Sequence, residues 1–177
     1  LGMEFTDLDL QTEKSRLGNV FAMKYSDFNH DMSDFITQVR MQGNFINSEI
    51  HSDDIAFFAP EMKTWNSKIF LSGKVRGTVD HLKGDAIIVK TGKETLLQGN
   101  FTIDGLPDMD NTFLDVKADK LITTYTDVAV IYPGIKTITK PNIAKLQRLN
   151  FSGSFTGYLK DFVAYGTVQT SLGTAVT

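Results

Sequence analysis

The side chains best suited to chemistry in this sequence are three histidines, His30, His51 and His81. None of them has another histidine or a carboxylate at a spacing typical of a metal site. The chain contains no cysteine, which excludes thiolate ligands and disulfide bonds. We therefore expect no metal site and no cofactor.

Two short polar stretches resemble ligand loops but lack their defining spacing. DGLPDMDNT, residues 104–112, has carboxylates but neither the EF-hand spacing nor its closing glutamate. KTGKET, residues 90–95, lacks the spacing of a phosphate-binding loop. We predict a polar turn at the first and a hairpin turn at the second. No serine lies in a G-x-S-x-G elbow, so we expect no catalytic residues and no enzyme activity.

The composition is typical of a globular segment, with 41% apolar and 22% charged residues. The net charge of −3 offers no basic surface, so we do not expect nucleic acid as a partner. No apolar run approaches the 18 or so residues of a membrane-spanning helix. Both ends of the sequence read as interrupted strands, and we interpret residues 1–177 as a single fragment of a longer protein, whose membrane anchor would be missing here.

The dominant pattern is an alternation of apolar and polar residues, which indicates strands with one apolar and one polar face. It runs through residues 69–80, 95–104 and 149–159. Glycines fall on the apolar side, where the missing bulk would let the sheet curl. Further strands are predicted at 3–10, 17–24, 37–50, 86–91, 113–118, 120–125 and 162–170. The fold class is therefore mainly β, with antiparallel strands.

Helical signals are few and short. SDDIAFFAP, residues 52–60, and YTDVAVIYPG, residues 125–134, each predict one or two turns that end at a proline. KPNIAKLQRL, residues 140–149, predicts a helix that starts near Pro141. Residues 27–35 predict a loop or a short irregular helix.

Several stretches recur at spacings of 73 to 80 residues, which predicts a repeating β unit of about 79 residues. LSGKVRGTVDHLKG and FSGSFTGYLKDFVA align two glycines, and HSDDIAFFAP aligns with TYTDVAVIYP through Asp54 and Asp127. Thr12, Thr91 and Thr170 occupy equivalent places. MQGNF at 41–45 also echoes LQGNF at 97–101. The alternative is a single irregular β-sandwich whose strands resemble each other by chance.

Three stretches of the sequence share one resemblance. They are DIAFFAPEMKTWNSKIFLSGKVRGTVDHLKGDAIIVKTGKETLLQGNFTIDGLPDMDNTFLDV, IYPGI and LNFSGSFTGYLKDFVAYGTVQT. Together they resemble the C-terminal part of TamB, the translocation and assembly module family of the AsmA-like superfamily, in its Bacteroidetes-type form. The resemblance implies a curled, open, taco-like sheet with an apolar concave face. It also implies a periplasmic segment of an inner-membrane-anchored cell-envelope protein of a Gram-negative bacterium. Family members are linked to phospholipid transport, to outer-membrane biogenesis and protein secretion, and to an outer-membrane barrel partner of the TamA or BamA type.

These observations favour an apolar groove that shelters phospholipid acyl chains, with a closed core as the alternative arrangement of the same residues. The predicted lining residues are Leu71, Val75, Val79, Leu97, Phe101, Ile103, Phe151, Phe155 and Leu159. A second hypothesis is a β-sheet interaction module that pairs its edges with strands of outer-membrane proteins and conducts no lipid. A third is a carbohydrate-binding β-sandwich that uses Trp65 and tyrosines.

Overall fold

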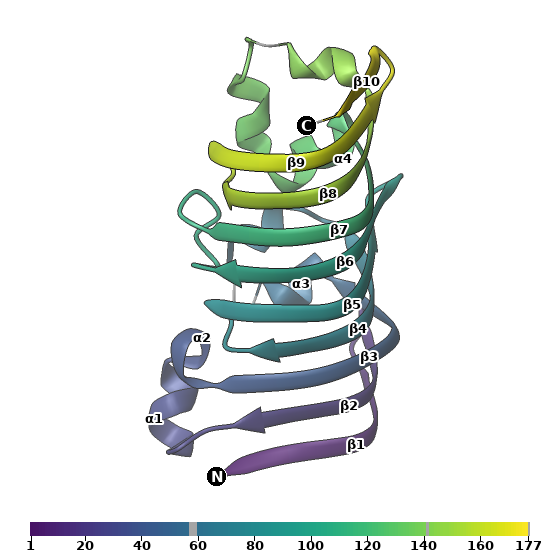
Figure 1. The fold of residues 1–177 in the computed structure, drawn as a ribbon. Coiled ribbons are helices and arrows are strands. Elements are labelled where there is room, and N and C mark those ends of the chain that lie inside the picture. The colour runs from purple at the N-terminus through teal and green to yellow at the C-terminus, as the bar shows by residue number, and fades with distance from the viewer. Residues whose placement is uncertain (57–59, 141, 177) are drawn as a thin grey trace.

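The computed structural model describes residues 1–56, 60–140 and 142–176 as one antiparallel sheet of ten strands. The strands follow each other in sequence order from β1 to β10, so every strand pairs with its neighbours in the chain (Figure 1). A few short helices lie in the connections. The predicted fold class, mainly β with antiparallel strands and few short helices, is confirmed.

The strands are long, and most have nine to twelve residues. Their bounds are β1 Gly2–Gln11, β2 Arg16–Lys24, β3 Arg40–His51, β4 Lys68–Gly77, β5 His81–Thr91, β6 Thr95–Asp104, β7 Phe113–Thr124, β8 Arg148–Tyr158, β9 Asp161–Thr170 and β10 Gly173–Val176. The helices are α1 Phe28–Ser33, α2 Phe35–Gln38, α3 Ser52–Ile55 and α4 Tyr125–Ile131, with 3-10 turns η1 Pro60–Thr64, η2 Pro133–Thr137 and η3 Ile143–Leu146.

The predicted elements differ from the structure at several places. The strand predicted at 37–50 begins only at Arg40, because α2 takes up its first residues, and the strand predicted at 86–91 is only the second half of β5. The two strands predicted at 113–118 and 120–125 are one strand, β7, interrupted by a bulge. The helix predicted over residues 140–149 is wrong beyond one 3-10 turn, because β8 begins at Arg148. Its predicted start at Pro141 lies outside the described residues. Of the helical turn predicted at 52–60, α3 forms the first part, and residues 57–59 lie outside the described residues.

The sheet bends because four of its strands carry an extra residue near the middle. The pairing register shifts in β1 between Phe5 and Leu8, in β3 between Phe45 and Ser48, in β5 between Gly84 and Ile87, and in β7 between Ala118 and Leu121. A bulge bends its strand and increases the local twist. Since the four bulges lie at matching heights on alternate strands, they combine into one crease across the sheet (Figure 1).

Small residues lie opposite the bulges along this crease. Gly99 and Gly153 are in direct register with Ala118 on the strand between them. Both glycines have a φ of +149°, and an added Cβ would overlap the carbonyl oxygen of Lys117 or of Tyr165. Only glycine combines this backbone conformation with so close an approach of two strands.

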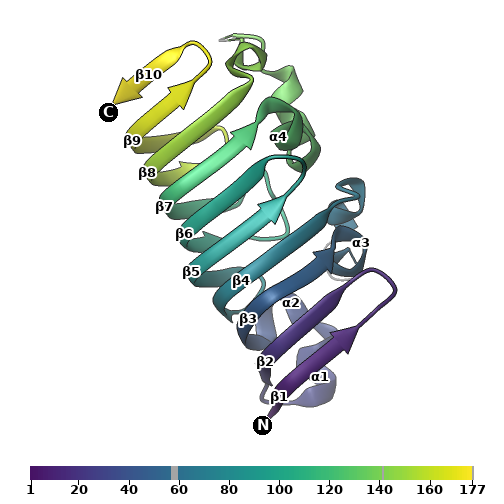
Figure 2. The same ribbon diagram turned by 90° about the vertical axis from the view of Figure 1, so that its right-hand side faces the viewer.

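The crease divides the sheet into two walls whose free ends form two rims (Figure 2). The first rim consists of the described residues 12–15, 52–56, 60–67, 92–94, 125–140, 142–147 and 171–172, and it carries α3 and α4. The second rim consists of residues 25–39, 78–80, 105–112 and 159–160, and it carries α1 and α2. Every connection between strands therefore belongs to one rim or the other.

The chain forms very little closed core. Among the described residues the buried apolar side chains are Val39, Ile87, Ala118, Ala129 and Phe151. The accessible surface is 10786 Å². A compact monomer of 19.7 kDa would expose about 8,600 Å². The excess of about a quarter is what a single-layer sheet, open on both faces, would produce.

Candidate functional site: an apolar face between two rims

The cross-strand register places one continuous set of apolar side chains on one side of the sheet, called the apolar face below. Leu71 pairs with Val89, Val89 with Leu97, and Leu97 with Leu121. Directly paired residues point to the same side of a sheet. The row therefore crosses four strands without a polar interruption. It continues through Phe151, the partner of Leu121, to Val168. A further row includes Ile103 with Leu114.

Seven of the nine predicted lining residues lie on strands of this face. They are Leu71, Val75, Leu97, Phe101, Ile103, Phe151 and Phe155. Val79 and Leu159 lie instead in the turns after β4 and β8, on the second rim. The alternation of apolar and polar residues continues past the ends of both strands, which is why the sequence predicted these two residues as part of the lining.

Aromatic rings fill the space that glycines leave on the wall nearer the second rim. A Cβ on Gly84 would overlap the ring of Phe101, its partner in register. Phe155 and Phe162 stack with ring centroids 4.6 Å apart. These rings are only half-buried or exposed, with Phe162 at 52% exposure. They therefore present a deformable apolar surface and do not seal a core.

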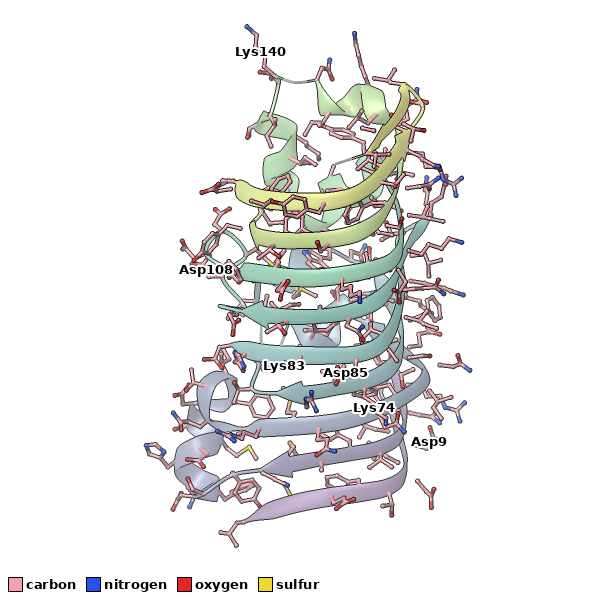
Figure 3. The ribbon with its side chains drawn as sticks, viewed as in Figure 1. Asp9, Lys74, Lys83, Asp85, Asp108 and Lys140 are labelled. Carbon is pink, nitrogen blue, oxygen red and sulfur yellow. The ribbon has the colours of Figure 1, made fainter. Side chains whose placement is uncertain are left out.

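The opposite side of the sheet, called the polar face, carries most of the strand charges. Lys74 pairs with Asp85, and Arg76 forms an ion pair of 3.2 Å with the same Asp85. Figure 3 shows Asp9 outside the bend of the strands. A shallow hollow of about 230 Å³ on this face is lined by five charged side chains, Arg76, Lys83, Asp85, Asp115 and Lys117, and by Asn100. Its cations and anions nearly balance, which gives no reason to assign it a ligand.

Two aspartates brace the hairpins of the first rim in the same way. Asp54 on α3 accepts hydrogen bonds from the hydroxyls of Thr12, at 2.7 Å, and Ser15 in the β1–β2 turn. Asp127 on α4 accepts bonds from the amides of Lys93, Glu94 and Thr95 in the β5–β6 turn, at 2.9–3.2 Å. Each aspartate thus lies on the helix that follows a strand, β3 or β7, and binds the hairpin turn that comes two strands earlier in the chain.

The predicted equivalent threonines lie at corresponding hairpins. Thr12 is in the β1–β2 turn, Thr91 ends β5 and Thr170 ends β9, so successive members are four strands apart. The echo between MQGNF and LQGNF does not fit this spacing. Its two copies lie on β3 and β6, which run in opposite directions in the antiparallel sheet.

Hydrogen bonding keeps the rim aspartates charged. Burial alone would raise the pKa of Asp127, but the amides of Glu94 and Lys93 and the hydroxyl of Thr95 outweigh it and lower the pKa. The hydroxyls of Ser15 and Thr12 lower the pKa of Asp54. On the second rim, His30 and the amides of Ser26 and Asp27 hold the pKa of the buried Asp31 well below its usual range.

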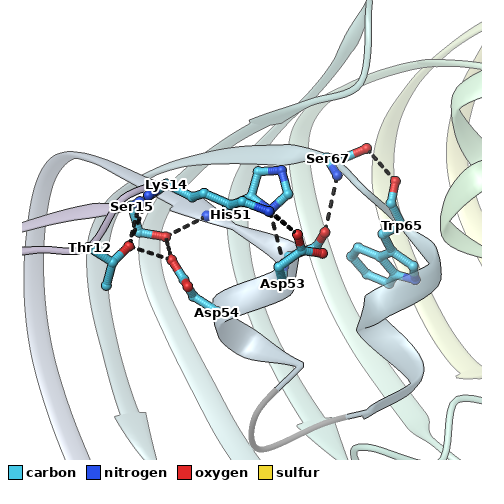
Figure 4. Close-up of polar contacts among 9 residues, drawn as sticks. Thr12, Lys14, Ser15, His51, Asp53, Asp54, Trp65 and Ser67 are labelled. Atoms are coloured by element: carbon cyan, nitrogen blue, oxygen red, sulfur yellow. Dashed lines mark hydrogen bonds and ion pairs between the residues drawn. The ribbon is translucent and has the colours of Figure 1, made fainter.

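Ser15, His51 and Asp54 lie together but do not form a nucleophile and its base (Figure 4). The backbone amide of His51 donates to the Ser15 hydroxyl at 2.8 Å. The ring nitrogen Nδ1 of His51 accepts from the amide of Asp53 at 3.1 Å and so caps α3. The cluster is therefore a structural brace for the hairpin. Trp65, beside it in the same connection, is half-buried.

A second polar cluster joins the two rims. Tyr132, at the end of α4 on the first rim, donates its hydroxyl to Asp110 Oδ1 at 3.0 Å. Lys160, in the β8–β9 turn of the second rim, lies 2.9 Å from the same oxygen. Sequence reasoning missed this cluster, because Asp110 appears only as part of a polar turn.

The predicted turns are confirmed, since residues 92–94 and 105–112 connect neighbouring strands. In the part of the chain that the structure describes, no group of three or more histidine or acidic side chains could hold a metal ion. Among its helices none has the length and hydropathy needed to cross a bilayer.

Comparison with known proteins gives no identification: no protein-family model, no curated protein and no solved structure matches this chain. Membership of the TamB family therefore stays a prediction from the sequence.

Proposed function

We propose that this chain is a segment of a lipid-transport protein of the bacterial cell envelope, and that its apolar face is the inner side of the bend and holds phospholipid acyl chains. The observation that carries the proposal is the continuous row of apolar residues across successive strands, only partly buried in a sheet that buries few side chains. The resemblance to TamB supports the same role, with passage toward the outer membrane and a barrel partner.

The dimensions of the sheet suit this role. Ten strands spaced about 4.8 Å apart make a face about 43 Å long, and each wall is about five residues, or roughly 16 Å, deep. The hydrocarbon region of a whole bilayer is about 30 Å thick, so one leaflet is about half of that. An acyl chain fits within the face, and each buried CH₂ contributes about 0.8 kcal/mol.

The test is photo-crosslinking to lipid from adjacent residues on opposite faces. A photoreactive amino acid at Phe101 or Phe155 is expected to capture phospholipid in cells. The matched positions Thr102 and Thr156 lie on the polar face and are expected to capture little. Absence of lipid from both Phe101 and Phe155, at full expression, would reject the groove.

A second candidate function is strand pairing with other envelope proteins and without lipid. In this structure β1 and β10 each have a free edge, and all four residues of β10 are exposed. Such edges can accept an added strand. Crosslinks from Ala175 to a protein, together with no lipid at Phe101, would favour this function over the groove.

A further inference from the structure

We propose that residues 125–140, called the strap, are a gate that closes the mouth of the groove over β6–β8 and must open before a lipid head group can pass there. The inference rests on the proposed function, because it concerns access to the same apolar face. Its observation is independent, namely the contact that joins Tyr132 of the strap to Asp110 and Lys160 of the opposite rim.

The geometry of β7 shows how far the rims have approached each other. β7 runs from Phe113 at the second rim to Thr124 at the first, a path of about 36 Å along the strand. α4 starts at the next residue and has seven residues, which is about 10 Å of helix. Yet Tyr132, directly after α4, reaches Asp110, three residues before β7 begins. The strap therefore crosses from one rim to the other.

Both ends of this crossing are anchored. At its base the amide of Tyr125 donates to the carbonyl of Gln147 at 2.9 Å, and Asp127 holds the β5–β6 turn. At its far side the loop of Asp110 is kept in shape by Asp108, which accepts bonds from the Asp110 amide and the Asn111 side chain. The contact thus joins two ordered elements.

The anchoring contact itself is exposed, with the Lys160 and Asp110 side chains at 63% and 58%. Exposed ion pairs are weak, so the contact is suited to opening and closing.

The head group explains why the gate must open. A phospholipid whose chains lie on the apolar face keeps its head group in water, at the mouth between the rims. Over β6–β8 that place is occupied by the strap, so a head group there and the closed strap exclude each other. Because the head group can bind only when the strap is open, a passing lipid shifts the equilibrium of the strap toward the open state.

The first arm of the experiment tests the contact without lipid. Tyr132→Phe removes the hydroxyl and is expected to speed amide hydrogen exchange several-fold in residues 128–138. Tyr125→Phe, at the other end of α4, is the control and is expected to leave these rates unchanged. Equal exchange in wild type and Tyr132→Phe would show that the contact does not hold the strap and would overturn the proposal.

The second arm tests the gate, using the absence of natural cysteines. Asp110→Cys with Tyr132→Cys is bridged by a short bis-thiosulfonate reagent that a reductant cleaves. Lipid from phosphatidylethanolamine–phosphatidylglycerol vesicles is then photo-captured at Phe155 or at Phe45, which pairs with Gly73 of β4 on the apolar face. Bridging is expected to slow capture at Phe155, under the strap, at least five-fold, to leave Phe45 unchanged, and to be reversed by reductant. Equal rates at Phe155 with and without the bridge would overturn the gate but leave the groove intact. No capture at either position in any form would overturn the groove, and the gate with it.

Discussion

The hydroxyl of Tyr132 donates to the carboxylate of Asp110, and these two residues flank opposite ends of the same strand, β7. A flat strand of that length would hold its ends about 36 Å apart. The contact is therefore a measure of curvature, and it depends on the crease that the bulges and small residues create in mid-sheet. Gly99, Ala118 and Gly153 at the crease thus control how closely the rims approach.

The crease makes a first prediction about Gly99. Gly99→Ala is expected to destabilise the protein by about 2–3 kcal/mol, because its φ of +149° disfavours a side chain and the new Cβ would overlap the carbonyl of Lys117. Urea unfolding followed by circular dichroism measures the change. Gly173→Ala is the matched control, since Gly173 has a φ of +143° and no atom within 4 Å of an added Cβ. A loss of equal size in both variants would show that backbone strain alone, and not the close approach of strands, sets the cost.

A second prediction compares the two rim aspartates. Asp127→Asn removes the charge that three amides and the Thr95 hydroxyl share, and is expected to cost about 2 kcal/mol in the free energy of unfolding. Asp54→Asn removes the charge and one of two acceptor oxygens at a more exposed site, where the carboxylate accepts two hydroxyl bonds, and is expected to cost about 1 kcal/mol. The opposite order in urea unfolding would contradict the assignment of Asp127 as the stronger brace.

A third prediction follows from the pKa values of the same groups. The pKa values of Asp127, Asp54 and Asp31 are lower in the folded chain than in the unfolded chain. Such groups stabilise the fold fully above the unfolded pKa of about 4. This stabilisation is lost as the pH falls from there through the folded pKa values. Unfolding free energies measured between pH 6 and pH 2.5 should be flat above about pH 5 and then decline, and less steeply in Asp127→Asn. An unchanged acid limb in that variant would show that Asp127 does not contribute to it.

Most of the fold could be predicted from the alternation of apolar and polar residues, because a strand with one apolar side repeats every two residues in the sequence. The bulges left a weaker trace. The alternation changes phase at Asp119, which led to a prediction of two strands where β7 is one. The β5 bulge, where Ala86 has a φ of +50°, left its trace at Gly84 and Asp85, because both residue types are uncommon in strands. The strand was therefore predicted only from residue 86, although β5 begins at His81.

Of the site, the apolar face was predictable and the contacts across the mouth were not. Local periodicity places Leu71, Leu97 and Phe155 each on the apolar side of its own strand, and the pairing of neighbouring strands in sequence order brings these sides together. The approach of Tyr132 to Asp110 depends on the bend of the whole sheet, a property that no short stretch contains. The bracing of the β5–β6 hairpin by Asp127 lies between these cases. Its alignment with Asp54 marked the position, but the hydrogen-bond partners in the hairpin turns could not be read from the sequence.

A final prediction separates an exposed lipid-binding face from a surface with no ligand, by placing the same charge on either side of one strand. Leu97 faces Val89 and Leu121, whereas its neighbour Gln98 faces Ile88 and Lys120 on the polar side. Leu97→Asp puts an unpaired carboxylate among apolar groups, where an acyl chain would have to desolvate it. We expect about a ten-fold loss of co-purified phospholipid, equivalent to about 1.4 kcal/mol. Gln98→Asp places its carboxylate opposite Lys120 and should retain lipid at the wild-type level. Mass spectrometry of solvent extracts measures the lipid, and circular dichroism confirms that both variants fold. Equal lipid in the two folded variants would contradict binding at this face, because only one of them alters it.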